Sequence, residues 1–271
     1  MIKIIGIDLD DTLLNSNKVI SQNNKEILNK ISDKVYVVLV SGRPLVKKTI
    51  DYYEFLDLKN DNVYFIGYNG AAIYDVKSKE EIYKIMMDYE MIMDVHNSID
   101  KGFNLSHYIH VKEGILYDNY NDYTYLEKKF NNFEIKEIDF GKLDNNIKCY
   151  KYMVAGEPDL IKKVFKELPK RIIEEYNVVI SMPCYIEFQP KDVSKWQTLC
   201  TLGKMVGAND DEIMAIGDSL NDYDMIKKSK YGVCMENGRD DCKEVAKYVT
   251  DTNDLDGVKK AIEYFMKEIA E

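Results

Sequence analysis

Short apolar runs recur in the first part of the chain, and each ends at a polar or glycine-containing turn. The runs Ile2–Leu9, Val35–Val40 and Val63–Gly67 are almost continuously apolar, without the alternation of a strand that has one face in water. Such runs are typical of parallel strands that helices cover on both faces. Between them, Ser21 can cap one helix and Pro44 fits the first turn of another. The alternation of strand and helix predicts a parallel sheet with right-handed crossovers.

The middle of the chain has a different pattern, in which short aromatic runs with strand character alternate with helical segments. The predicted strands are Phe103–His110, Ile147–Val154 and Val178–Met182, and the predicted helices are Tyr89–Lys101, Tyr123–Phe130 and Leu160–Tyr176. After about Ser194 the first pattern returns. The predicted elements there are a helix to Met205, a strand at Glu212–Ile216, a helix at Asp222–Lys227, a strand at Tyr231–Met235 and a last helix from about Leu255.

This change of pattern and its reversal predict one domain interrupted by another. We expect an α/β fold with a three-layer, Rossmann-like core whose sheet is parallel. Residues 1–84 and 186–271 would form this core, and residues 85–185 would form an inserted α+β domain.

Polar segments stand where the predicted strands end or where helices begin. Asp8, Asp10 and Asp11 follow the first strand within four residues, and crowded carboxylates are costly to desolvate unless something neutralises them. Three further segments have the same placement: Ser41-Gly42-Arg43, Lys195 behind a capping Ser194, and Gly217-Asp218-Ser219-Leu220-Asn221-Asp222. Ligands bind at the carboxyl ends of the strands in open parallel sheets, so the four segments predict one site.

The residue types in these segments fit phosphoryl transfer. Asp8 and Asp218, with an oxygen from Asp10, can supply the hard ligands that Mg²⁺ prefers. One aspartate can attack phosphorus, and a second, two residues on, can pass a proton to the leaving group and later take one from water. Lys195 would compensate charge, while Ser41 and Asn221 are predicted to donate hydrogen bonds to phosphate oxygens.

Composition restricts the partners of this site. The net charge is −10, which argues against a broad surface for nucleic acid. The sequence shows no signal peptide and no apolar stretch long enough for a membrane span, and its five cysteines form no Cys-x-x-Cys pair. We therefore expect a cytoplasmic protein, a monomer or homodimer, whose partner is a small phosphorylated metabolite.

The four segments resemble those of the haloacid dehalogenase superfamily of phosphohydrolases. The motifs that carry the resemblance are IDLDDTLLNSNKVIS, SGR, SKWQTL and AIGDSLNDYDMI, and they are closest to the Cof-type branch, which has a cap domain between the second and third motifs. The resemblance covers roughly residues 1–80 and 186–271 well. It implies that the domain at 85–185 is a cap that determines substrate specificity.

The resemblance also implies a role for each residue of the site. Asp8 would be the nucleophile and Asp10 the acid and base, and both would bind Mg²⁺ together with Asp218, supported by Asp222. The implied phosphate contacts are Leu9 through its backbone, Ser41, Gly42, Lys195 and Asn221. Arg43 would either bind substrate or pair with a neighbouring carboxylate.

Two positions depart from the family pattern, because Asp11 and Trp196 stand where relatives usually have glycine. Aspartate tolerates the left-handed backbone region better than most residues, so we expect the turn at Asp11 to be kept. The indole of Trp196 is expected to narrow the rim of the pocket or to press on the cap.

The leading hypothesis is a Mg²⁺-dependent phosphatase that hydrolyses small phosphomonoesters through an aspartyl-phosphate, with sugar phosphates as the leading class of substrate. One alternative is a phosphotransferase or phosphomutase on the same scaffold. A second alternative is a phospho-acceptor signalling domain. Asp10 argues against it, because a long-lived phosphoaspartate needs no acid–base partner two residues away.

Overall fold

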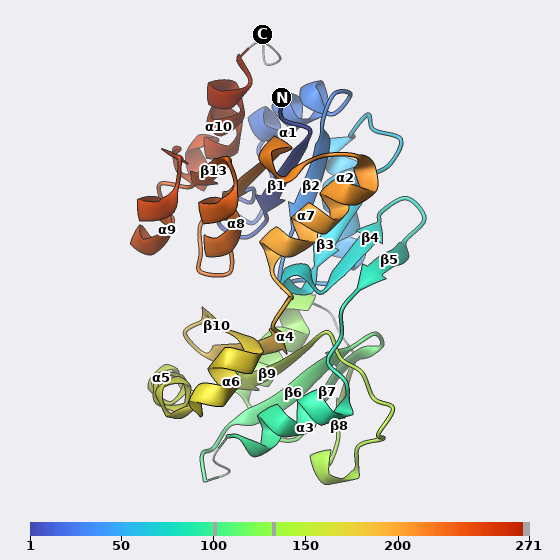
Figure 1. Cartoon of the computed structure of the whole chain (residues 1–271), viewed down its shortest axis with the longest axis vertical. Helices are drawn as coiled ribbons and strands as arrows, with labels where there is room; N and C mark the ends of the chain where they lie inside the picture. The colour runs from blue at the N-terminus through green and yellow to red at the C-terminus, as the bar shows by residue number, and fades with distance from the viewer. Residues whose placement is uncertain (100–101, 132–133, 268–271) are drawn as a thin grey trace. The chain divides into compact units, whose positions relative to one another are not determined.

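The computed structural model describes residues 1–99, 102–131 and 134–267, and the chain forms two compact units (Figure 1). The first unit consists of Met1–Lys84 and Ser194–Glu271, and the second is Ile85–Val193, which we call the insert. The return to the first unit, expected at residue 186, occurs at Ser194. The reason is that Tyr185–Pro190 forms a strand of the insert's own sheet. The role of the insert as a specificity domain stays a prediction.

The first unit contains an eight-stranded sheet in the order β14-β13-β12-β1-β2-β3-β4-β5. Its strands are β1 (Ile4–Asp8), β2 (Tyr36–Val40), β3 (Tyr64–Gly67), β4 (Ala72–Asp75), β5 (Glu80–Lys84), β12 (Ile213–Gly217), β13 (Tyr231–Cys234) and β14 (Tyr248–Val249). Neighbours from β14 to β3 are parallel, whereas β3, β4 and β5 are antiparallel. β1 lies between β2 and β12, which places the strand that ends in Asp8 at the centre of the parallel part.

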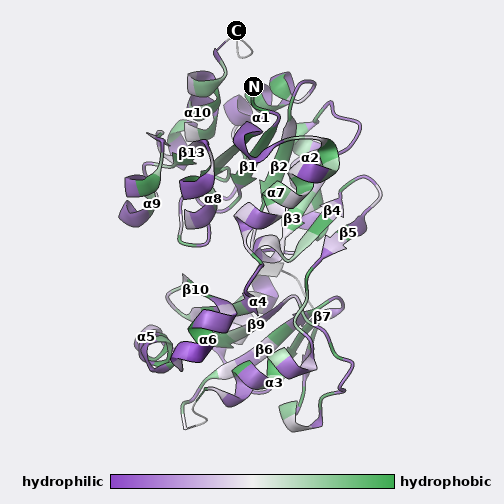
Figure 2. Cartoon of the chain, viewed as in Figure 1, coloured by the Kyte–Doolittle hydropathy of each residue, from purple (hydrophilic) through white to green (hydrophobic). Residues whose placement is uncertain are grey.

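Helices cover both faces of this sheet. They are α1 (Gln22–Ile31), α2 (Lys47–Leu56), α7 (Lys195–Val206), α8 (Tyr223–Lys228), α9 (Asp240–Val245) and α10 (Gly257–Phe265). Apolar residues of α1, α2 and α10 pack with Ile5 and Ile7 of β1, while α7 and α8 pack in a separate cluster with Ile4. Figure 2 shows the central strands as hydrophobic and the visible sides of α8 and α9 as largely hydrophilic. The predicted α/β fold with a layered, parallel-sheet core is confirmed.

The insert is built around a six-stranded sheet in the order β10-β11-β9-β6-β7-β8. Its elements are α3 (Tyr89–Asn97), β6 (Ser106–Val111), β7 (Gly114–Tyr117), α4 (Asp122–Asn131), β8 (Ile135–Glu137), β9 (Lys151–Ala155), α5 (Pro158–Glu167), α6 (Lys170–Glu175), β10 (Tyr176–Met182) and β11 (Tyr185–Pro190). Apart from the parallel pair β7 and β8, neighbouring strands are antiparallel. Helices α3, α5 and α6 contribute to its main apolar cluster, so the insert has a core of its own.

The predicted helix boundaries are partly right. Ser21 and Ser194 cap α1 and α7, and each side chain accepts a hydrogen bond from a backbone N–H of its helix, as expected. The helix expected from Pro44 is wrong at its start, because α2 begins at Lys47 after Val46. The single helix expected over 160–176 is two helices that are separated at Pro169. The predicted end of α3 at Lys101 lies outside the described residues.

Among the helices that the structure describes, none has both the length and the apolar character needed to cross a lipid bilayer.

Candidate active site

Two adjacent parallel strands bring the first and last acidic segments together. β1 ends at Asp8 and β12 ends at Gly217, and their register pairs Ile7 with Ile216. Asp8 and Asp218 therefore leave the same edge of the sheet side by side. A side chain at Gly217 would lie 2.5 Å from the Cβ atom of Asp222, so only glycine lets the following loop fold back this closely.

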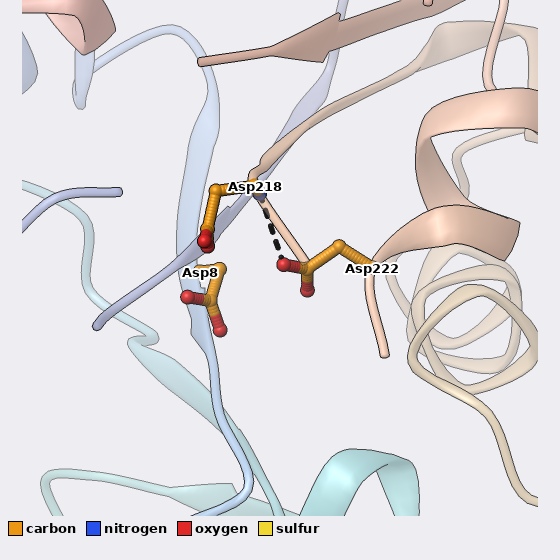
Figure 3. Close-up of side chains that lie close together, drawn as sticks. All are labelled: Asp8, Asp218 and Asp222. Atoms are coloured by element: carbon orange, nitrogen blue, oxygen red, sulfur yellow. Dashed lines mark hydrogen bonds between the residues drawn. The ribbon is translucent and has the colours of Figure 1, made fainter. Parts of the chain in front are cut away.

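Asp8, Asp218 and Asp222 form a group of carboxylates (Figure 3). One oxygen from each lies within 4.8 Å of the others. Asp8 and Asp222 are buried. The loop is held in shape by Asp222, whose Oδ2 accepts hydrogen bonds of 3.1 Å from the backbone N–H groups of Asp218 and Ser219. Three hard oxygen donors are thus gathered at one point, as a divalent cation requires.

Lys195 reaches this group from the first turn of α7. Its Nζ atom lies 2.5 Å from Oδ1 of Asp8 and 2.6 Å from Oδ1 of Asp222, and its side chain is fully buried. Burial alone would lower the pKa of Lys195, but the charges of Asp222 and Asp8 raise it above its ordinary value, so the ammonium stays charged. Lys195 thus lies where it can compensate the charge of Asp8, while its contact with phosphate stays a prediction.

One ammonium does not balance the three carboxylates. Burial, followed by the charge of Asp222, raises the pKa of Asp8 well above its ordinary value, although Lys195 lowers it. Burial and Asp222 also raise the pKa of Asp218 to about 7. Both shifts come first from burial and next from the neighbouring carboxylate of Asp222, so the ionised forms of Asp8 and Asp218 are disfavoured without a further cation. A divalent cation would supply the missing charge, so the donor set fits a metal ion.

The carboxylate of Asp10 does not join this group. Arg43 donates two hydrogen bonds to it, from Nε at 2.8 Å and from Nη2 at 2.6 Å. Lys18 lies 3.4 Å from Oδ1 of Asp10 and 2.8 Å from Oδ1 of Asp11. Asp11 has a φ of 60°, so it keeps the left-handed turn that glycine would otherwise favour. Of the two roles expected for Arg43, the structure has the pairing with a carboxylate.

The segment 41–43 lies in a loop, not at a helix start, because α2 begins only at Lys47. Ser41 is buried, and its Oγ accepts a hydrogen bond of 3.2 Å from the backbone N–H of Arg43. Asn221 donates from Nδ2 to Oδ1 of Asn69 at 3.1 Å. A side chain at Gly42 would lie 3.1 Å from the same Asn69 oxygen. These contacts connect the second and fourth predicted segments.

Two residues of the site carried no assigned role in the sequence analysis. Thr12 is fully buried and donates from Oγ1 to Oδ1 of Asp218 at 3.1 Å, which orients that carboxylate. Its position directly after the aspartates was the available signal. The second residue is Asn69, which lies two positions after the predicted strand Val63–Gly67. Leu9, expected to act through its backbone, is buried directly after Asp8.

Trp196 does not take the expected place at a pocket rim. Its ring is buried in the apolar cluster that α7 forms with the sheet, together with Ile66 and Ile73. The ring packs in the core of the first unit and does not narrow a pocket rim, whereas the alternative that it presses on the cap stays a prediction.

The family of haloacid dehalogenase-like hydrolases matches residues 5–262, which is nearly the whole chain. The chain belongs to this family. The predicted hydrolase that acts on phosphate esters is thereby confirmed at the level of the family.

Relatives of this hydrolase carry the name phosphatase. The 5-amino-6-(5-phospho-D-ribitylamino)uracil phosphatase YcsE of Bacillus subtilis is 33% identical over 268 residues, covering 98% of this chain and 96% of the relative. The phosphatase YwpJ of Bacillus subtilis is 29% identical over 304 residues, covering 97% of this chain and 100% of the relative.

Solved structures show the same fold. A haloacid dehalogenase-like hydrolase from Bacteroides thetaiotaomicron superposes with a TM-score of 0.82 at 32% identity, over 98% of this chain and 100% of that one. The sugar phosphatase BT4131 of HAD subclass IIB superposes with a TM-score of 0.79 at 22% identity, over 97% of this chain and 98% of that one. At this identity the second likeness shows the fold alone.

Proposed function

We propose that the protein is a cytoplasmic, Mg²⁺-dependent phosphatase that hydrolyses small phosphomonoesters through an aspartyl-phosphate on Asp8. The observation that carries the proposal is the buried carboxylate of Asp8 at the end of β1, 2.5 Å from Lys195 and grouped with Asp218 and Asp222. A carboxylate held between a cation and a metal-binding group is a nucleophile whose charge is compensated when an anionic phosphate approaches.

The metal would be held by Asp8, Asp218 and an oxygen of Asp10, with Asp222 supporting the loop. When bound, Mg²⁺ supplies positive charge that offsets the carboxylates and polarises a phosphoryl oxygen. Asp10 would contribute its backbone oxygen, because its carboxylate is paired with Arg43.

The chain's own residues would perform two chemical steps. In the first, an oxygen of Asp8 forms a bond to phosphorus while the ester P–O bond breaks, and Asp10, which must be protonated at the start of this step, gives its proton to the departing alkoxide. In the second, Asp10 takes a proton from water as that water attacks the phosphorus of the acyl phosphate, which releases phosphate and the free carboxylate. Lys195 stays near Oδ1 of Asp8 in both steps. The backbone of Leu9 and Gly42, with Ser41 and Asn221, would donate to the phosphoryl oxygens.

Sugar phosphates, or phosphates of open-chain polyols, are the proposed substrates. Support comes from the relative YcsE, whose named substrate carries its phosphate on a ribityl chain. We also propose that the insert contacts the leaving group of the substrate and so determines specificity. In the insert's sheet, Lys151 of β9 and Glu187 of β11 form a buried ion pair of 3.2 Å, and such pairs stabilise a fold no better than apolar residues of similar volume.

Replacement of Asp8 tests the proposal. In Asp8→Asn an amide takes the place of the carboxylate with little change of volume, and it cannot attack phosphorus. We expect the rate of p-nitrophenyl phosphate hydrolysis in Mg²⁺ to fall by at least about 10³-fold, with an unchanged circular dichroism spectrum. Asp11→Asn is the matched control, because Asp11 lies in the same loop with its carboxylate exposed and should keep nearly full activity. A folded Asp8→Asn variant with wild-type turnover would show that Asp8 is not the nucleophile.

Isotope and chelator experiments separate the alternatives. A phosphatase places oxygen from ¹⁸O-water in the released phosphate. A phosphotransferase or mutase moves the phosphoryl group to a sugar hydroxyl, so no oxygen from water enters the phosphate. A signalling domain would instead accumulate a long-lived phosphoenzyme. Full activity in excess chelator would remove the metal from the mechanism.

A further inference from the structure

The turn Tyr68–Gly70 directly follows β3 and touches three of the four segments that build the candidate site. We propose that Asn69, at the centre of this turn, is a positioning residue that fixes the side-chain amide of Asn221 for phosphate binding. The inference deepens the proposed function and depends on it, since it concerns a phosphate contact assigned there.

The backbone of the turn is unusual. Tyr68 and Asn69 have φ values of 51° and 55°, and Gly70 has a φ of 107°. Residues other than glycine rarely adopt this left-handed region, and asparagine tolerates it better than most. Consecutive left-handed residues persist only where their surroundings hold them, and such strain concentrates at functional sites.

Backbone hydrogen bonds attach the turn to the segment 41–43. The N–H of Asn69 donates to the carbonyl of Ser41 at 2.9 Å, and the N–H of Tyr68 donates to the carbonyl of Arg43 at 3.1 Å. The left-handed conformation is therefore what lets the turn follow the outline of this loop.

The same turn is attached to α7 on its other side. The hydroxyl of Thr198, one helical turn after Lys195, donates to the carbonyl of Gly70 at 2.6 Å. A side chain at Gly70 would lie 2.5 Å from the carbonyl oxygen of Ser194, so glycine is required for this approach. The turn thus holds the 41–43 loop and the start of α7 at a fixed distance from each other.

The side chain of Asn69 makes the third connection. Its Oδ1 accepts the hydrogen bond of 3.1 Å from Nδ2 of Asn221, and Asn69 is nearly buried, with 7% of its surface exposed. An amide nitrogen carries two protons. With one donated to Asn69, the plane of the Asn221 amide is fixed, and its second proton has a defined direction in which to meet a phosphoryl oxygen. Fixing a donor before the ligand arrives removes an entropic cost of binding.

A variant at Asn69 separates this role from a purely structural one. Glycine adopts the left-handed region without steric cost, so Asn69→Gly keeps the turn and removes the side chain whose Oδ1 accepts from Asn221. We expect its affinity for inorganic phosphate, measured by calorimetry in Mg²⁺, to fall about threefold to tenfold, the usual range for one hydrogen bond. We expect its melting temperature to change little, because relief of the left-handed backbone strain and loss of the buried hydrogen bond act in opposite directions. Lys79→Gly is the matched control, because Lys79 has a φ of 60° in an exposed turn and should leave phosphate affinity unchanged.

A double-mutant cycle completes the test. If Asn69 acts through Asn221, the pair Asn69→Gly and Asn221→Ala should bind phosphate no more weakly than Asn221→Ala alone. Additive losses, or an Asn69→Gly variant with wild-type phosphate affinity, would overturn the inference while leaving the proposed function intact. Unchanged affinity in Asn221→Ala would overturn both the phosphate role of Asn221 and the inference. A wild-type protein that hydrolyses no phosphomonoester would instead contradict the proposed function itself.

Discussion

At the scale of single residues, the site contains two kinds of ion pair with different consequences. Lys195 is fully buried between Asp8 and Asp222, so its removal would leave two carboxylates without their cation in a place withdrawn from water. Breaking a buried pair in this way destabilises proteins strongly. A loss of activity in a Lys195 variant could therefore come from unfolding as well as from a slower chemical step. The pair of Arg43 and Asp10 is partly exposed and offers a cleaner experiment.

Arg43→Lys should impair the acid–base step and spare the others. Lysine keeps the positive charge but cannot make the two parallel hydrogen bonds that hold the carboxylate of Asp10. We expect kcat/KM on alkyl phosphates, whose leaving groups need a proton, to fall about tenfold to 100-fold. The loss on p-nitrophenyl phosphate should be smaller, because nitrophenolate leaves without a proton.

The control for this prediction is Lys18→Gln. Lys18 also lies near Asp10, at 3.4 Å, but its side chain is exposed, and exposed pairs contribute little. Steady-state kinetics over a series of leaving groups gives the measurement. Equal losses across the series for Arg43→Lys would mean that Arg43 contacts the phosphoryl group and does not position Asp10.

At the scale of elements, the sequence predicted well what depends on local patterns. The apolar runs of β1, β2 and β12 indicated buried parallel strands, and serine caps located the starts of α1 and α7. The hairpin of β4 and β5 was missed, because its strands are short and β5 alternates between exposed and half-buried residues. The break between α5 and α6 was also missed, although Pro169 was its signal.

The rest of the site could not be read from the sequence, because it depends on contacts between distant positions. Asp10 and Arg43 are separated by 33 positions, and Asn69 and Asn221 by 152. No local rule pairs such residues, so the sequence identified the chemistry of Arg43 without its partner and passed over Asn69. Motif spacing located the aspartates, but only the sheet register shows that Asp8 and Asp218 are neighbours.

Trp196→Ala tests the role of α7 as a packing element. The indole is buried in the cluster between this helix and the sheet, so its removal should lower the free energy of unfolding by about 3–5 kcal/mol. Gln197→Ala, at the exposed neighbouring position, should change it by less than about 0.5 kcal/mol. Urea denaturation measures both. Wild-type stability of Trp196→Ala together with an altered substrate profile would show that the indole lies at the pocket rim and not in the core.

At the scale of the whole molecule, the two units are expected to divide the work. The residues assigned to the chemistry all lie in the first unit, and every phosphomonoester presents the same phosphoryl group to them. Discrimination between leaving groups must then come from other residues, and the insert is the large part of the chain without an assigned role.

Replacing Ile85–Val193 by a short Gly/Ser linker tests this division. β5 ends at Lys84, which pairs with Ala72, and Ser194 lies close to Gly70, so a short linker can join the two ends. We expect weak hydrolysis of p-nitrophenyl phosphate and a loss of preference among sugar phosphates. Solubility and circular dichroism of the shortened protein are the controls. A folded variant that keeps the parent's ranking of sugar phosphates would place selection in the first unit.

His110 should make the insert sensitive to acid. Burial, and next the charge of Lys151, lowers the pKa of His110 well below its ordinary value of 6.5. The unfolded chain therefore binds a proton below pH 6.5 that the folded insert binds only at lower pH. Stability contributed by the neutral ring is complete above pH 6.5 and is lost as pH falls, by up to about 1.4 kcal/mol per pH unit.

Hydrogen exchange in β6 and β9 between pH 7 and pH 5 measures this effect, after correction for the intrinsic exchange rate. His110→Gln should reduce the slope of stability against pH by about one proton, whereas Lys112→Gln, at an exposed position beside β6, should leave it unchanged. An unaltered slope in His110→Gln would show that the ring is not the titrating group.

The central position of β1 has a consequence for the nascent chain during synthesis. β1 leaves the ribosome long before its partner β12, which begins at Ile213, so one edge of β1 has no neighbour in the interval. Pairings between such distant segments form slowly, and an open apolar strand edge can associate with other chains. The insert has its own apolar core and can fold during this interval. A nascent chain also lacks Lys195 and Asp218 until the insert has been synthesised, so catalytic competence can appear only after both residues have left the ribosome.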